Sequence, residues 1–180
     1  LGITEIIDNK LFERVHPCLV GKDNYIGNIN GVMNAIILEG KPVGQSVLQG
    51  EGAGPGATSS ALMSDLLSIL RGNIKYPFGT PFSKRKKVNS YNKDKYSNSL
   101  YLRFEVKDKP GVLSSITKIF AKNKISIKNL IQMPNKKNQK ASVIIITHEN
   151  FEKNYINLLK NLSKNKFVIG KPIFIRIANI

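Results

Sequence analysis

Apolar side chains in residues 99–180 recur with two different periods. Leu102, Phe104 and Val106 alternate with Tyr101, Arg103 and Glu105, which predicts a strand with one buried face. Three more apolar runs predict strands, beginning at Ile125, Ser142 and Pro172. Two sets of apolar residues at helical spacing predict helices: Val112, Leu113, Ile116, Ile119 and Phe120, then Phe151, Tyr155, Leu158, Leu159 and Leu162. The resulting order, βαββαβ, predicts an α+β unit in which two helices cover one face of a four-stranded sheet.

Shorter apolar runs in residues 1–72 predict a second, earlier domain. Residues 1–7 and 11–20 have strand character, and Pro17 interrupts the second run. The apolar segments 32–38 and 43–49 flank a Gly-Pro turn and predict an antiparallel hairpin. Apolar residues at helical spacing then predict a helix over residues 58–71, ended by Gly72: Leu62, Leu66, Leu67, Ile69 and Leu70.

Residues 73–98 have little apolar periodicity and are rich in polar and basic side chains. Such a composition predicts a mobile, exposed linker. The sequence thus divides into residues 1–72, a basic linker over 73–98, and residues 99–180.

The net charge of +16 is confined to the second half, because residues 1–72 carry five basic and seven acidic side chains. A basic nucleic-acid-binding protein is one interpretation, and the run Lys84–Lys87 suits an acidic partner. However, the chain has 23 Lys but only five Arg, together with 23 Ile and 19 Asn. Codons rich in A and T explain all of these biases, whereas readers of nucleic acid favour Arg. No nucleic-acid or membrane partner is therefore expected.

Several further features narrow the class of protein. No apolar run approaches the roughly 20 residues of a membrane helix, and no signal peptide is visible. The single cysteine, Cys18, fits a reducing cytoplasm. Cys18, His16 and His148 lack the spacing of a metal site, so no metal is expected. The chain opens on a strand-like segment without Met, which predicts part of a longer protein.

The densest cluster of glycines lies just before the first predicted helix, at Gly50, Gly52, Gly54 and Gly56. Glycine allows sharp turns and close approach of a ligand to the backbone. The segment Thr58–Ser60 offers hydroxyls that can cap the helix, and a helix N-terminus favours an anion such as phosphate. The alternative is that these glycines only form a tight corner between a strand and a helix.

The motifs resemble a known family. Asn30–Leu67, with its segment GEGAGPGATSS, and VHPCLV at Val15–Val20 are similar to the end of the catalytic region of homoserine dehydrogenases. Leu100–Gln132, which contains DKPGVL, resembles the ACT domain that follows in many bacterial members. The resemblance implies the end of an α/β catalytic domain, with mostly antiparallel strands and helices, followed by a ferredoxin-like ACT domain.

The resemblance also implies an activity. Homoserine dehydrogenases interconvert L-aspartate 4-semialdehyde and L-homoserine with NAD or NADP, on the route to threonine, methionine and isoleucine. By position, the cofactor-binding residues are Gly50, Gly52, Ala53 and, most strongly, Gly54. The family's catalytic lysine lies before residue 1, and the G-x-G-x-x-G fingerprint is absent. We therefore assign no catalytic residue and expect the 180 residues alone to be inactive.

In ACT domains, amino acids bind near the first strand-to-helix turn, at an interface between paired copies. Here that turn contributes Asp108, Lys109, Pro110, Gly111, Val112 and Leu113. The resemblance implies threonine as a feedback inhibitor and a homo-oligomer, with Asp108 receiving the ammonium group of the ligand. Two alternatives stay open: Asp108 only caps the helix, and the chain is a non-catalytic amino-acid-binding or dimerisation module.

Overall fold

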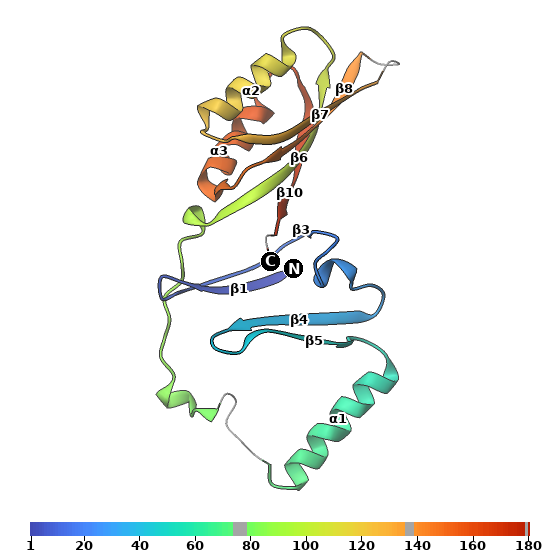
Figure 1. Ribbon diagram of the computed structural model, residues 1–180, viewed down its shortest axis with the longest axis vertical. Helices are drawn as coiled ribbons and strands as arrows, with labels where there is room; N and C mark the ends of the chain where they lie inside the picture. Colours follow the sequence, from blue (N-terminus) through green and yellow to red (C-terminus); the bar gives the residue numbers. More distant parts are fainter. Residues whose placement is uncertain (74–78, 136–138, 179) are drawn as a thin grey trace. The chain divides into compact units, whose positions relative to one another are not determined.

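The computed structural model describes residues 1–73, 79–135, 139–178 and 180 (Figure 1). Part of the predicted linker, residues 74–78, and part of a predicted loop, residues 136–138, lie outside the described residues. The chain forms two compact units: residues 1–20 together with 88–180, and residues 21–87.

The first unit contains the predicted βαββαβ order. Its strands and helices are β6 (Ser97–Lys107), α2 (Val112–Lys122), β7 (Ile127–Asn135), β8 (Lys140–Thr147), α3 (Glu152–Ser163) and β10 (Val168–Ile177). The strand order β10-β6-β8-β7 is antiparallel between all neighbours, and α2 and α3 lie on the same side of the sheet (Figure 1). The predicted α+β fold of this unit is confirmed.

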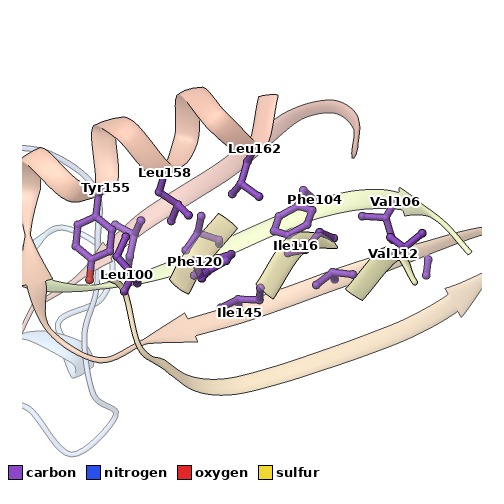
Figure 2. Packing of buried hydrophobic residues seen from close by; sticks show 14 residues of the cluster. Leu100, Phe104, Val106, Val112, Ile116, Phe120, Ile145, Tyr155, Leu158 and Leu162 are labelled. Carbon is purple, nitrogen blue, oxygen red and sulfur yellow. The ribbon is translucent and has the colours of Figure 1, made fainter. Parts of the chain in front are cut away.

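The core of this unit lies between the sheet and the two helices. Alternate residues of β6, from Leu100 to Val106, are at most 3% exposed, as the period of two requires. In Figure 2, Tyr155, Leu158 and Leu162 of α3 point toward the same strand. Helix α2 adds three buried side chains: Val112, Ile116 and Phe120. The hydrophobic stripes predicted for both helices are therefore the faces that the helices bury, except that Phe151 is exposed.

Residues 1–20 join this unit rather than the segment that follows them. Strands β1 (Gly2–Ile7) and β2 (Lys10–Val15) form an antiparallel hairpin, and β3 (Cys18–Leu19) pairs in parallel with β10. The strand break expected at Pro17 falls between β2 and β3.

The second half of the predicted linker packs against this hairpin. The backbone of Leu11 bonds with Asn89 and Tyr91, and the ring of Tyr96 stacks on Phe12 at 4.0 Å. A short 3-10 helix, η4 (Lys93–Lys95), and the bridge strand β9 (Asn150–Phe151) complete the unit. The prediction of exposure is thus wrong for Tyr91, Tyr96 and Asn98, which are half-buried or buried because they find partners far away in the sequence, whereas most of the other residues of 89–98 are exposed as predicted. The domain boundaries at residues 72 and 98 stay predictions.

The second unit contains η1 (Ile26–Asn28), the hairpin β4 (Met33–Gly40) and β5 (Gly44–Glu51), helix α1 (Pro55–Leu70) and η3 (Phe82–Lys84). The predicted hairpin is confirmed, with Met33 paired to Glu51 and Gly40 to Gly44. Helix α1 begins three residues before the predicted start, and none of its residues is buried. Among the described residues of this unit, nothing therefore buries its leucine and isoleucine stripe.

Candidate functional sites

The glycine-rich segment forms the turn between β5 and α1. Gly50 pairs with Asn34 inside the hairpin, and the N–H of Gly52 donates to the carbonyl of Val32 at 2.8 Å. Gly54 has φ +122°, a backbone conformation that residues with a Cβ rarely adopt. A Cβ at Gly52 would lie 1.5 Å from Nδ2 of Asn34. The turn therefore needs glycine at position 54 and tolerates a side chain at position 52 only if Asn34 moves.

Helix α1 begins directly on this turn. Gly54 is the N-cap residue, Pro55 is the first helical residue, and Thr58 donates its N–H to the carbonyl of Gly54 at 3.1 Å. Thr58, Ser59 and Ser60 lie inside the helix, and Ser59 Oγ donates to the carbonyl of Pro55 at 2.7 Å. The predicted hydroxyl cap at these positions is wrong, because the glycine turn lets the helix start one turn earlier.

This turn presents exposed backbone directly before a helix N-terminus. Gly50, Gly52, Ala53 and Gly54 are exposed, and a Cβ added at Gly50 or Gly54 would meet nothing within 4 Å. The backbone N–H groups at the start of α1 carry the positive end of the helix dipole. The segment thus offers bare backbone and partial positive charge to a ligand, and its residues fit the group.

A second candidate site is a hollow of about 440 Å³ at the junction of β6 and α2. Its lining comprises Asp108, Lys109, Pro110, Gly111, Val112 and Leu113, together with Gln132. The structure therefore brings all six predicted effector residues together around one open space. The hollow falls within the roughly 300–1,000 Å³ typical of small-molecule sites.

Gln132 is a lining residue that the sequence reasoning missed. It lies on β7, and its Nε2 donates to Oδ1 of Asp108 at 3.0 Å. The topology contains a signal for this contact, because β6 and β7 both pair antiparallel with β8 and so end at the same edge of the sheet. This arrangement predicts that a polar residue near the end of β7 reaches the turn after β6.

Asp108 does not cap the helix, so the capping alternative is wrong. The N-cap of α2 is Gly111, in the left-handed conformation with φ +83°, and no side chain bonds to the helix start there. Pro110 precedes the helix instead of standing in its first turn. The Asp108 carboxylate therefore faces the hollow from outside the helix, where Gln132 holds it.

His16 and Cys18 lie close together, whereas His148 is in a different part of the same unit. Nδ1 of His16 lies 2.9 Å from the carbonyl of Pro17 and 3.2 Å from Sγ of Cys18, and burial lowers the pKa of His16. The backbone of His148 bonds to Ser126 and Tyr155. Within the described part of the chain, no three His, Cys, Asp or Glu side chains are placed to hold a metal ion. In the same residues, no helix has both the length and the apolar character that crossing a bilayer requires.

Comparison with known families places both halves of the chain. Residues 100–167 match the ACT domain, a ferredoxin-like unit with the strand and helix order described above. Residues 3–67 match the homoserine dehydrogenase family. The chain therefore corresponds to the C-terminal region of homoserine dehydrogenases together with an ACT domain.

Individual relatives agree with this assignment. Homoserine dehydrogenase of Helicobacter pylori is 34% identical over 99% of the chain and that of Pseudomonas aeruginosa is 28% identical over all of it. A solved homoserine dehydrogenase of Thiobacillus denitrificans superposes on 98% of the chain with a TM-score of 0.84 and 30% identity. The chain spans 42% and 43% of the two sequences and 41% of the solved chain.

Proposed function

We propose that this chain is part of an NAD(P)-dependent homoserine dehydrogenase, which interconverts L-aspartate 4-semialdehyde and L-homoserine in the synthesis of threonine, methionine and isoleucine. The observation that carries the proposal is the family match over residues 3–67, which contains the exposed glycine turn before α1. The reducing cytoplasm is the compartment that a single cysteine favours.

In this function, the glycine turn contributes to cofactor binding. The turn presents the backbone of four residues to NAD or NADP: Gly50, Gly52, Ala53 and Gly54. Gly54 matters most, because any side chain at its backbone conformation would be strained. The cofactor supplies hydride transfer when it is bound. The residues of this chain position the cofactor. The 180 residues contain no candidate for the group that transfers the proton, so that group belongs to another part of the enzyme.

A chimera tests the activity. The 180 residues are joined to the preceding region of the Helicobacter pylori enzyme, with which they share 34% identity, and NAD(P)H formation from L-homoserine is followed by absorbance. We expect activity from the chimera and none from the 180 residues alone. An inactive chimera that folds and binds NADP contradicts the proposal. Homoserine oxidation by the isolated chain contradicts only the expectation that these 180 residues are inactive alone.

The hollow between β6 and α2 is the proposed effector site, with L-threonine as the feedback inhibitor. The Asp108 carboxylate suits the ligand's ammonium group, and the N-terminal turn of α2 suits its carboxylate. Lys109, Pro110, Gly111, Val112 and Leu113 complete the wall. Feedback of useful strength needs a coupling of only about 1–3 kcal/mol between effector and active sites.

Calorimetric titration tests the effector site, with L-isoleucine, L-methionine and L-serine as comparison ligands. We expect selective threonine binding, lost in Asp108→Asn and retained in Asp94→Asn, a matched change on η4, whose half-buried Asp94 does not line the hollow. If none of the four binds, the alternative of a dimerisation module gains support. Sedimentation of the same samples then tests the proposed homo-oligomer directly.

A further inference from the structure

One glycine of the turn between β5 and α1 leaves a space that the side chain of another residue fills. A Cβ added at Gly50, Gly54 or Gly56 would meet nothing within 4 Å. At Gly52 the added Cβ would overlap the side-chain amide of Asn34. Gly52 thus makes room for Asn34, whereas the other three glycines leave open space beside the backbone.

Backbone groups hold the Asn34 amide beside the turn. Asn34 lies on β4, where it pairs with Gly50 of β5. Its Nδ2 donates to the carbonyl of Val32 at 3.4 Å, and the N–H of Gly52 donates to the same carbonyl at 2.8 Å. Because a carbonyl only accepts hydrogen bonds, this contact sets the amide with Nδ2 toward Val32.

The same amide is open to a ligand. Asn34 is exposed, like every residue from 50 to 54. Among the described residues no group bonds to Oδ1 of Asn34, so this oxygen and the second N–H of the amide are available. An amide oxygen repels a phosphate but accepts a hydrogen bond from a neutral donor. In a nicotinamide cofactor, the carboxamide and the ribose hydroxyls are such donors.

We propose that Asn34 is a cofactor-binding residue of the glycine turn. Its amide occupies the side-chain position that Gly52 leaves empty and forms a hydrogen bond with a neutral group of NAD or NADP. The anionic diphosphate instead suits the N–H groups at the start of α1. The side chain of Glu51 lies on the opposite face of the hairpin, because Glu51 pairs with Met33 and side chains alternate along a strand. This inference rests on the proposed function, and it adds a residue from outside the glycine motif.

Kinetics of the active chimera test the role of Asn34. We expect Asn34→Ala to raise the KM for the cofactor roughly three- to tenfold and to leave kcat and the KM for L-homoserine near their original values. Asn30→Ala is the matched control, because Asn30 is also exposed and its Nδ2 also donates to a carbonyl two residues earlier, that of Asn28. An active chimera in which Asn34→Ala leaves the cofactor KM unchanged overturns this proposal alone. A folded but inactive chimera overturns the proposed function and this inference with it.

Gly52→Ala supplies a second variant and a sharper criterion. The added Cβ displaces the Asn34 amide, so we expect the cofactor KM to rise about as much as in Asn34→Ala. The double variant should be no worse than either single variant, because the amide contact is lost only once. If Gly52 is bare so that the cofactor can approach its backbone, the two effects multiply instead, and that result overturns the proposal.

The acetylpyridine analogue of the cofactor distinguishes the two neutral groups. This analogue keeps the carbonyl of the carboxamide but lacks its N–H₂ group. If Oδ1 of Asn34 accepts from that group, Asn34→Ala no longer changes the KM when the analogue is used. If the partner is a ribose hydroxyl, the same rise in KM persists, and both results support the contact. Equal rises in the KM for the cofactor and for L-homoserine indicate a general disturbance of the turn and overturn the proposal.

Discussion

The hydroxyl oxygen of Tyr155 lies 2.7 Å from Oγ1 of Thr147, inside the core of the first unit. Both residues are at most 1% exposed. Thr147 Oγ1 also accepts the N–H of Leu100 at 3.0 Å, and the Tyr155 hydroxyl lies 2.8 Å from the carbonyl of Asn98 and 2.9 Å from that of His148. One hydroxyl pair thus links α3, β6 and β8 through backbone groups at the edge of an apolar core.

Replacement of Tyr155 by Phe removes the hydroxyl and keeps the ring. We expect the free energy of unfolding to fall by about 1–3 kcal/mol, because the one hydroxyl proton is lost to the nearby buried carbonyls and Thr147 loses its side-chain partner. Urea denaturation measures the change. Tyr101→Phe is the control, since Tyr101 is only half-buried on the opposite face of β6, and it should change stability by less than about 0.5 kcal/mol. Equal effects of the two variants would show that the hydroxyl network does not contribute to the free energy of unfolding.

The ion pair of Glu152 and Arg176 predicts a pH dependence of stability. Burial by itself raises the pKa of the Glu152 carboxyl, but hydrogen bonds from Arg176 and Asn98 and the charge of Arg176 outweigh it. The folded-state pKa therefore lies below the ordinary value of 4.5, and the stabilisation is fully present above that pH. It is lost as the pH falls through the lowered pKa.

Glu152→Gln tests this dependence. We expect a loss of roughly 1–3 kcal/mol near pH 7, and a flatter stability profile below pH 4.5 than that of the unaltered chain. Thermal unfolding across the pH range measures both. Glu105→Gln is the control, because the Glu105 contact with Lys140 is exposed and 3.9 Å long. Parallel profiles for Glu152→Gln and the unaltered chain would contradict the prediction.

Helix α3 has one face buried in the core and one face exposed, so two substitutions on it compare the two environments. Leu158 is fully buried whereas Ile156, two residues earlier, is 52% exposed. Leu158→Ala leaves a cavity and is expected to cost about 2–5 kcal/mol of unfolding free energy. Ile156→Ala removes a similar volume from the surface and should cost less than about 1 kcal/mol. Chemical denaturation of both variants checks the difference, and similar losses would mean that α3 is not packed as described.

Two glycines at the start of α1 are predicted to respond in opposite ways to alanine. Gly54→Ala places a side chain at φ +122° and is expected to cost about 1–3 kcal/mol. Gly56 lies in the helix without a positive φ and has open space around it, so Gly56→Ala should stabilise α1 by about 0.5–1 kcal/mol. Circular dichroism during thermal unfolding reports on both.

The same pair tests the proposed cofactor turn. In the active chimera, Gly54→Ala should raise the KM for the nicotinamide cofactor, and Gly56→Ala should leave it near the original value. Equal KM values for all three proteins would remove Gly54 from the proposed cofactor contacts.

The turn that holds the candidate effector residues was predictable because these residues are consecutive, while their effector role stays a prediction. Asp108–Leu113 form one turn between a strand and a helix, and local sequence reports such a turn directly. Gln132 was not predictable from spacing, because its contact with Asp108 depends on two strands that end at the same edge of the sheet.

The sequence by itself determined the βαββαβ order, the hairpin of β4 and β5 and the buried faces of α2 and α3. These follow from hydrophobic period and turn residues, which act over a few neighbouring positions. Only the tertiary structure decided that residues 1–20 join the first unit, that Tyr96 stacks on Phe12, and that Gly111 instead of Asp108 is the N-cap residue of α2. Each of these depends on backbone pairing, ring packing or backbone conformation between groups whose spacing along the chain carries no periodic signal.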